Sequence, residues 1–468
     1  MREIDVAVIG AGPAGLAAAT VAAKCGLQTV ILDEQATPGG QIYRAVSAGG
    51  QTRGDILGQD YLDGARLIDA LLASGAERVD RATVWNVEAD GTVTWSHSRQ
   101  TRQVRARRII IATGTVERAL PILGWTLPGV MTVGAGQILL KQSGLVPRRA
   151  VIVGCGPLIY LLAQQLIRAG SPPLALVETQ DMSGIWHAIK HLGGAIRGWR
   201  YLAKGMAMLR EIRKAGVRRY TGCRPLHIKG EVRAEGISFL VGKRKVDIAC
   251  DTLLLHQGVI PNTQMTRALR VDHVWDERQY CFQPALDEWG RTSLPGIYVA
   301  GDGAGIGGAK AAALGGSRAA WHAARSLDAV SEEAMTEHIA EIDAGLAAEL
   351  SVRPFLDSLY PPAPEALRPD DHVIVCRCEE VTAGTIRRLA REGCTGPNQM
   401  KAFTRCGMGP CQGRFCAPVV TQLLAEVHAR SPAEIATYRI RPPLKPITLG
   451  ELASLDDEPE PAASASRH

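Results

Sequence analysis

Six of the eleven cysteines fall between residues 376 and 416, with a spacing that could hold a metal centre. Cys376 and Cys378 are separated by one residue, and Cys411 and Cys416 are separated by four. Thiolates are soft ligands that suit iron–sulfur clusters and zinc, and a common cluster takes four of them. Zinc sites more often use pairs two to four residues apart, so the leading C-x-C favours iron–sulfur, with structural zinc as the alternative.

Cys406 offers a competing choice, because it stands five residues before Cys411 and forms a second C-x4-C pair. The spacing of the four cysteines named first, in its glycine-rich context, resembles the [2Fe-2S] module of bacterioferritin-associated ferredoxins. That resemblance implies that Cys406 and Cys394 are bystanders. The ligands that it implies are Cys376, Cys378, Cys411 and Cys416.

A dinucleotide motif, G-x-G-x-x-G, follows the apolar run 6–9 near the N-terminus. Its first glycine permits a tight turn, its second lets the backbone approach a pyrophosphate, and its third lets helix and strand pack closely. The N-terminus of the helix that follows favours phosphate charge. We therefore expect the turn to contact a nucleotide through Gly10, Gly12, Pro13, Ala14 and Gly15.

A second strand is expected at residues 29–32, and it ends at Asp33 and Glu34. A carboxylate at this place can accept hydrogen bonds from the adenosine ribose hydroxyls. Asp33 fits the spacing from the glycine motif better, and Glu34 is its neighbour. A turn that has the fold but holds no nucleotide is the alternative.

Three further passages accompany the motif: a strand ending in small residues at 109–114, the segment 294–302, and Pro-Gly-Gly-Gln at 38–41. In this arrangement, residues 1 to about 325 resemble the flavoprotein disulfide reductase superfamily, especially thioredoxin-reductase-like proteins. The resemblance implies FAD or a related adenine nucleotide in the first site. Arg44, like Arg118, could hold a phosphate or a flavin carbonyl, or form an ordinary surface pair. The further residues expected at the site are Gly40, Gln41, Arg44, Val84, Thr113, Gly114, Gly301 and Asp302.

A second nucleotide-type turn, Gly154-Cys155-Gly156-Pro157, follows the apolar run 150–153. Ile159 stands where a third glycine is expected, and its branched side chain would hinder close packing or force the loop outward. Glu178 closes the next strand, as a ribose acceptor should. NAD(P)H binding and a vestigial structural lobe both remain open, so NAD(P) is a doubtful cofactor.

The redox-active C-x-x-C that reductases of this superfamily commonly use does not occur in the sequence. The cysteines outside the late cluster are isolated, and we expect them to pack as small hydrophobic residues. Electrons from a flavin therefore need a different exit. These isolated cysteines are Cys25, Cys155, Cys223, Cys250 and Cys281.

Strand and helix patterns alternate up to about residue 327, which predicts an α/β fold with two Rossmann-like lobes and a small C-terminal [2Fe-2S] domain. Residues 1–120 and 260–328 form the predicted FAD-type domain, and 121–259 the inserted NAD-type domain. A helical and proline-rich connector at 329–371 leads to the [2Fe-2S] domain at 372–437. The extension 438–468 is expected to be disordered at its end.

Composition narrows the function class. The net charge of +6 comes without a basic stripe carrying interleaved aromatic residues, so we expect no nucleic-acid partner. No apolar run of membrane-spanning length occurs, and the first strand, expected from Ile4, leaves no room for a signal peptide. Clustered cysteines without a disulfide framework place the protein in the cytoplasm.

Two other groups of residues lack an obvious catalytic role. His187, His191 and His256 are lone histidines for which structural roles are expected, so no catalytic residue is assigned. The segment 196–212 has apolar residues at helical spacing and several arginines. It is either a packed helix with a solvated basic face or a subunit-docking helix.

Taken together, these parts resemble one family over nearly the whole chain: the α-type subunits of heteromeric opine, nopaline and D-hydroxyproline dehydrogenases and of hydrogen cyanide synthase. The family often has a small residue at the position of Cys406. The matching segments are 33–35, 38–44, 117–118, 124–130, 154–158, 407–414 and 441–446.

This resemblance implies a division of labour. A partner β-subunit with its own FAD oxidises an amine at Cα, and the imine hydrolyses to a 2-oxo acid and an amine. The α-subunit passes the electrons through flavin and cluster to an acceptor. The resemblance also implies FMN between subunits in some members, a possible small γ-subunit, and FAD, NAD or ATP in the α-type chain. The alternatives are a self-contained NAD(P)H:acceptor reductase with the cluster, a hydrogen cyanide synthase-like subunit and a non-catalytic scaffold.

Overall fold

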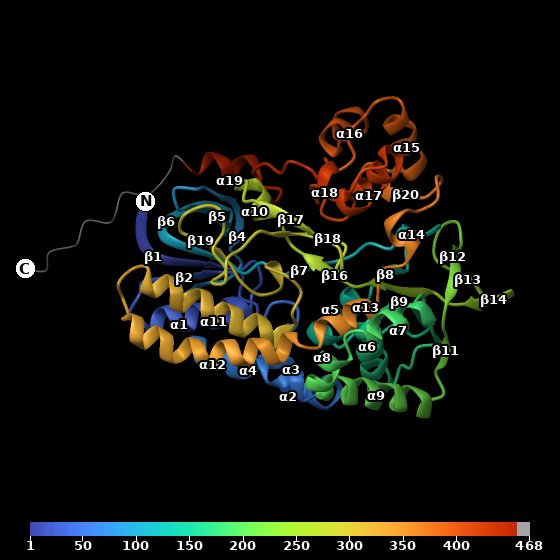
Figure 1. Ribbon diagram of the computed structural model, residues 1–468, viewed down its shortest axis with the longest axis horizontal. Coiled ribbons are helices and arrows are strands. Elements are labelled where there is room, and N and C mark those ends of the chain that lie inside the picture. The colour runs from blue at the N-terminus through green and yellow to red at the C-terminus, as the bar shows by residue number, and fades with distance from the viewer. Residues whose placement is uncertain (456–468) are drawn as a thin grey trace, which may run out of the picture.

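The computed structural model describes residues 1–455; the disorder expected at the chain end falls on residues 456–468, outside the described part. Figure 1 shows two α/β lobes side by side, with the late cysteine-rich module packed above them. A long connector helix runs beneath the first lobe toward the second. This arrangement brings the C-terminal third of the chain into contact with both lobes.

The first lobe is built on a mainly parallel sheet. Its parallel strands run in the order β3 (Glu77–Val79), β2 (Thr29–Leu32), β1 (Arg2–Ile9), β6 (Gln100–Ile111) and β19 (Ile297–Val299). The first half of β6 also pairs antiparallel with β5 (Thr92–His97), which pairs with β4 (Thr83–Val87). Parallel strands are buried on both faces, which explains the continuous apolar runs in β1 and the end of β6.

Helices cover this sheet. The largest contact is between α1 (Pro13–Lys24) and α11 (Ala309–Arg325), both rich in alanine and glycine. Small side chains let the two backbones approach closely, and a Cβ on Gly316 would lie 2.1 Å from the Ala14 carbonyl oxygen. The remaining helices of the lobe are α2 (Val46–Leu57), α3 (Gln59–Leu62), α4 (Gly64–Leu72) and α10 (Gln264–Ala268), beside the hairpin β17 (His273–Asp276) and β18 (Cys281–Pro284).

The second lobe is an insertion whose entry and exit strands, β7 (Thr115–Glu117) and β16 (Val259–Pro261), pair antiparallel. Its parallel sheet has the order β11 (Arg218–Tyr220), β10 (Ala175–Glu178), β9 (Ala150–Cys155), β15 (Thr252–Gln257) and β8 (Val130–Thr132). A three-stranded antiparallel sheet adds β12 (Cys223–Lys229), β13 (Gly236–Val241) and β14 (Arg244–Ala249). Its helices are α5 (Val133–Ser143), α6 (Pro157–Arg168), α7 (Met182–Ile189), α8 (Leu192–Arg197) and α9 (Trp199–Lys214).

The connector comprises α12 (Glu332–Leu350), α13 (Arg353–Leu359) and α14 (Pro364–Leu367). The module that follows holds the two short strands β20 (Ile374–Cys376) and β21 (Val381–Thr382), followed by helices. The final segment returns across the first lobe, where the Leu444 amide donates to the Trp85 carbonyl at 2.8 Å. The helices of this part are α15 (Ala383–Arg391), α16 (Pro397–Thr404), α17 (Ala417–His428), α18 (Pro432–Ile435) and α19 (Leu449–Ala453).

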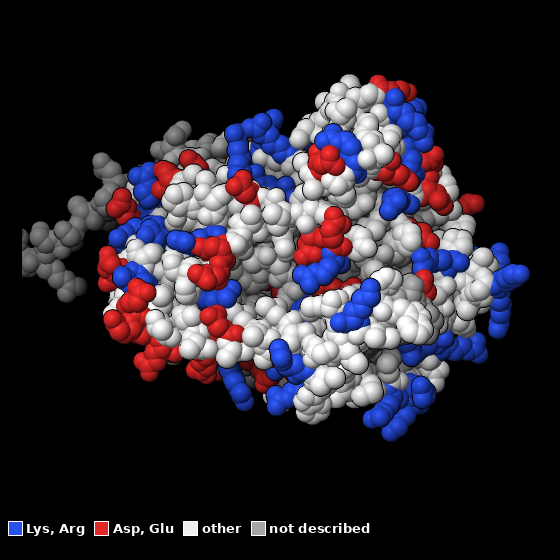
Figure 2. All heavy atoms as spheres, in the orientation of Figure 1, with Lys and Arg blue, Asp and Glu red and all other residues white. Residues whose placement is uncertain are grey.

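Charge is unevenly distributed on the face in Figure 2, where acidic side chains gather toward α12 and basic ones toward α9. No helix in the described part of the chain is both long enough and apolar enough to cross a bilayer.

The close packing of α1 on α11 can be tested with two adjacent glycines. We expect Gly316→Ala to lower the free energy of unfolding by about 1–3 kcal/mol, because the new methyl group meets the Ala14 backbone. Gly315→Ala is the matched control: its Cβ would lie 3.7 Å from the nearest backbone atom, and alanine favours the helix. Equal stability of the two variants in urea unfolding would contradict this packing.

Candidate functional site

The first glycine motif forms a tight turn between β1 and α1. A Cβ on Gly15 would lie 1.7 Å from the Gly10 carbonyl oxygen, and one on Gly40 would lie 2.7 Å from the Gly12 Cα. The turn and the segment after β2 are therefore in backbone contact at the end of the first sheet. Pro13 begins α1, whose N-terminus has no side-chain cap, so its free amide groups are available to phosphate oxygens.

Asp33 and Glu34 have different surroundings. Asp33 is buried, and its carboxylate accepts hydrogen bonds from the Ala11 amide at 2.6 Å and the Gln35 amide at 2.7 Å. Burial raises the pKa of Asp33, and these two amides act against that rise. Each carboxylate oxygen can accept a further hydrogen bond, so the predicted ribose contact remains compatible with this geometry. Glu34 is exposed and pairs with Lys445 at 2.7 Å.

Arg44 ties this segment together and is buried. Its Nε donates to the Gly40 carbonyl at 3.2 Å, and its other nitrogens donate to the side chains of Gln35 and Gln41. Lys141, on α5 of the inserted lobe, donates to the Gln41 carbonyl at 3.2 Å. Burial lowers the pKa of Lys141 to about 7. These bonds fasten the Gly40–Gln41 segment to both lobes.

The other predicted nucleotide contacts come from the ends of neighbouring strands. Gly10 approaches Thr113, and a Cβ on Gly301 would lie 2.6 Å from the Ala14 Cβ, so these residues surround the glycine turn. Asp302 accepts hydrogen bonds from the amides of Gly307 and Gly308, which precede α11.

Gly114 follows Thr113 in a left-handed conformation and accepts a hydrogen bond from the Asn262 amide at 2.9 Å. Val84 lies on β4 opposite Trp95, and none of its described contacts joins it to the glycine turn. Its role at the nucleotide remains a prediction.

The second glycine turn is covered by the chain's own connector. Cys155 in the turn lies 3.5 Å from the Pro361 carbonyl oxygen, and the Gln257 side chain accepts a hydrogen bond from the Ala363 amide at 2.8 Å. The same Gln257 donates to Thr179 at 3.0 Å, so it joins the ends of β15 and β10 to the connector. A dinucleotide would have to cross this edge of the sheet.

The carboxylate of Glu178 already has hydrogen-bond partners within the chain. It is fully buried, forms an ion pair with Arg219 at 2.6 Å and accepts a hydrogen bond from the Tyr160 hydroxyl at 3.0 Å. Gln180 donates a further bond at 2.5 Å. Ile159 packs in the lobe's core with no exposed surface. These contacts favour the vestigial lobe over a working NAD(P)H site.

The late cysteines form two groups of sulfur atoms. Those of Cys376, Cys406 and Cys416 lie within 4.8 Å of one another and are buried. Those of Cys378 and Cys411 lie 3.9 Å apart, nearer the surface. Two thiolates bound to one metal at about 2.3 Å and a tetrahedral angle are separated by about 3.8 Å, so the second pair fits one iron.

A cavity of about 290 Å³ distinguishes Cys406 from the other four cysteines. All four predicted ligands line it, together with Arg118, Trp125 and Phe415, and Cys406 does not. The Tyr438 hydroxyl donates to the Cys406 sulfur at 3.3 Å and also lies 4.0 Å from the Cys416 sulfur. The cavity favours the four predicted ligands, whereas the sulfur grouping also admits Cys406, so the ligand set remains a prediction.

Glycines and hydrogen bonds shape this pocket. A Cβ on Gly409 would lie 2.2 Å from the Cys378 Cβ, and Cβ atoms on Gly407 and Gly413 would meet the Tyr438 ring. The loop between Cys406 and Cys416 can therefore wrap closely around the sulfur atoms. Hydrogen bonds from the thiols of Cys406 and Cys416 lower the pKa of Cys376.

Several residues that build this site were not singled out from the sequence. Tyr438 lies sixty residues beyond Cys378, and Gln257 and Lys141 lie on the inserted lobe; no motif marks any of them. Arg118 was considered as a phosphate or flavin ligand. Its guanidinium group instead donates to three backbone carbonyl groups, those of Gln257, Gln279 and Tyr280.

Comparison with known proteins agrees with this arrangement. Residues 4–326 match the family model of pyridine nucleotide-disulphide oxidoreductases, and residues 374–426 match that of the BFD-like [2Fe-2S] binding domain. The chain is 44% identical to the A subunit of opine oxidase from Rhizobium meliloti (strain 1021), covering 96% of this chain and 98% of that protein. It is 43% identical to the corresponding opine oxidase chain from Agrobacterium tumefaciens (strain Ach5), covering 96% and 92%.

Among solved structures, L-proline dehydrogenase from P. horikoshii superposes with a TM-score of 0.70 at 18% identity, covering 96% of this chain and 79% of that one. At this identity the likeness concerns the fold. The predicted fold class, the family resemblance and the presence of a [2Fe-2S] domain are confirmed by these matches.

The ligand set can be tested by single substitutions. We expect Cys411→Ser and Cys416→Ser each to abolish the visible iron–sulfur absorption, because each removes one of four thiolates. Cys406→Ser is the matched control and should keep the absorption. Loss of the cluster in Cys406→Ser, with retention in Cys416→Ser, would show that Cys406 is the ligand.

Proposed function

We propose, from the premise that the chain belongs to the opine oxidase A-subunit family, that it is the electron-transfer subunit of a heteromeric flavin-dependent oxidoreductase. The complex would oxidise the C–N bond of an opine, D-hydroxyproline or a related amino acid to an imine, which hydrolyses to a 2-oxo acid and an amine. The observation that carries this proposal is a four-cysteine cavity beside a nucleotide core whose second dinucleotide edge is covered.

The glycine turn of the first lobe and the segment around Gly40 would hold FAD or another adenine nucleotide. Asp33 and Asp302 would accept hydrogen bonds from its hydroxyl groups, and Arg44 would keep the Gly40–Gln41 segment in place. Cys376, Cys378, Cys411 and Cys416 would hold the [2Fe-2S] cluster. A bound flavin accepts electrons in pairs and a bound cluster passes them singly, which suits a relay.

The electron-transfer edge would lie at Cys378. Its side chain is exposed and Cys411 is partly exposed, whereas Cys376 and Cys416 are buried. Trp125 and Phe415 line the same cavity and offer apolar walls to a flat ring. We therefore place the FMN of the proposed complex at a subunit interface on this side.

Substrate oxidation is assigned to a partner β-subunit with its own FAD. His256, the most buried of the histidines considered as bases, pairs with Glu117 at 2.6 Å, and both belong to the second lobe's junction with the first. This contact gives His256 a partner within the fold, and we assign it a structural role. The chain would thus receive electrons and would not bind the amine itself.

Exposed apolar side chains on α7–α9 support the proposal that a partner subunit binds this chain. Trp186, Ile196, Trp199 and Met206 each expose half or more of their surface. Such a patch on one side of a soluble lobe is typical of a protein interface. We propose that the β-subunit docks here, which corresponds to the docking-helix interpretation of residues 196–212. We place the complex in the cytoplasm, where unpaired thiols persist.

Titration with NADH distinguishes an electron-transfer subunit with a covered second lobe from a self-contained NAD(P)H reductase. In anaerobic titration of the isolated, flavin-loaded chain, we expect NADH and NADPH to leave the flavin spectrum unchanged, whereas dithionite should bleach it. Prompt bleaching by NADH would contradict the covered site.

The relay can be tested in the assembled complex. We expect the chain to co-purify with a second flavoprotein, and an added amine or opine to reduce the cluster, seen as loss of its visible absorption. In a complex carrying Cys416→Ser, the partner's flavin should still be reduced by the amine without a cluster signal. A wild-type cluster that stays oxidised during turnover would contradict electron transfer through this chain.

A further inference from the structure

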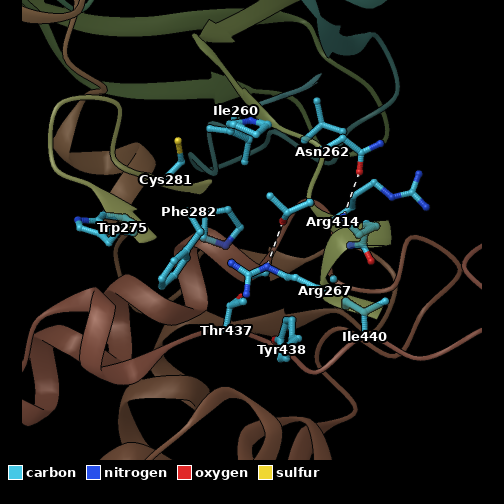
Figure 3. A pocket seen from close by; sticks show the side chains of 17 residues that line it. Ile260, Asn262, Arg267, Trp275, Cys281, Phe282, Arg414, Thr437, Tyr438 and Ile440 are labelled. Atoms are coloured by element: carbon cyan, nitrogen blue, oxygen red, sulfur yellow. Dashed lines mark hydrogen bonds between the residues drawn. The ribbon is translucent and has the colours of Figure 1, made fainter. Parts of the chain in front are cut away.

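A second cavity lies between the first lobe and the cysteine-rich module (Figure 3). Its volume is about 60 Å³, enough for a small polyatomic ion or a few water molecules. Among the 17 described residues that line it, two are arginines, Arg267 and Arg414, and none is acidic. Arg267 comes from α10 and Arg414 from the cysteine loop, and the guanidinium group of Arg414 donates to the Leu444 carbonyl at 3.5 Å.

Arg267 has fewer hydrogen-bond partners than Arg118, which is a buried arginine. Arg118 donates to three backbone carbonyl groups. Arg267 donates only its Nε, to Thr263 at 3.1 Å, and its charged group lies 4.8 Å from the centre of the Phe282 ring. Within the described part of the chain, its two terminal nitrogens have no hydrogen-bond partner and no carboxylate. Figure 3 shows this guanidinium group in the middle of the cavity's side chains.

Unpartnered polar atoms gather at the same place. Eleven buried side-chain nitrogen and oxygen atoms in the described residues lack a hydrogen-bond partner, and three belong to residues that line this cavity. They are the Nε of Arg414, the indole Nε1 of Trp275 and the Oε1 of Gln264. Buried polar atoms are nearly always paired, so the residues around this cavity are incompletely satisfied by partners within the described part of the chain.

We propose that this cavity binds a small oxyanion, a phosphate group or a carboxylate. Guanidinium groups bind the oxygens of either through parallel hydrogen bonds. The anion would neutralise the charge of Arg267 at the junction of lobe and module. Gln264 could accept a hydrogen bond from a protonated phosphate oxygen or from the ammonium group of an amino acid.

Burial supports this assignment, since it lowers the pKa of Arg267 to about 10, which reflects an uncompensated charge. The cavity wall includes Tyr438 and Gly413, which also shape the cysteine site, so an anion here would lie beside the cluster loop. The proposal does not depend on which amine the complex oxidises or on the partner subunit.

The test is isothermal titration of the holoprotein, with its first nucleotide site filled, by inorganic phosphate and separately by acetate in chloride buffer. We expect saturable binding of at least one anion at one site per chain. Arg267→Gln should weaken that binding by about tenfold or more, because it removes a charge-assisted pair. Arg270→Gln is the matched control: Arg270 is exposed three residues later and should leave the affinity unchanged.

Arg267→Lys provides a second variant that keeps the charge and removes the planar pair of donors, and it should weaken binding severalfold with flavin and cluster absorption unchanged. Preference for phosphate would identify a phosphate-bearing ligand, and preference for acetate a carboxylate. Absence of saturable binding by both anions, or equal affinity in Arg267→Gln and Arg270→Gln, would overturn the proposal.

Discussion

The hydrogen bonds that hold the connector against the second lobe are the constraint on which the rest of the structure depends. Gln257 binds the Ala363 amide and Thr179 at once, and thereby holds the connector over the edge where a dinucleotide would lie. The connector then leads directly into the cysteine-rich module, whose strand β20 is anchored by the Trp125 indole donating to the Ile374 carbonyl at 2.7 Å. In our proposal, one set of contacts therefore closes a nucleotide site and positions Cys376.

This constraint explains how an NAD-type lobe can serve a cluster module. The lobe keeps its parallel sheet and buries Ile159 in its core, yet its acidic residue Glu178 is engaged by Arg219 and Tyr160. The cysteine-rich module packs on one side of this lobe. In our proposal, a partner subunit packs on the other side. The chain's final segment adds a second tether through Leu444 and Lys445.

Local sequence patterns predicted much of the fold and part of the site. The predicted strand 29–32 is β2 itself, and the glycine motif forms the expected turn, because both depend on neighbouring residues. The ion pair of Glu178 with Arg219 could not be predicted from the sequence, since the two residues are distant in sequence. The same is true of the connector that lies over this lobe. Likewise, spacing alone left Cys406 as a rival, and the cavity, which Cys406 does not line, favours the other four cysteines.

The central claim is that the connector closes the second nucleotide site in the working protein. Hydrogen–deuterium exchange of the Ala363 amide, measured with and without saturating NADH, tests it most directly. The account predicts slow exchange in both states, because the bond to Gln257 is buried and persists. Faster exchange across residues 360–363 on addition of NADH would show that the cofactor displaces the connector, and would contradict the account.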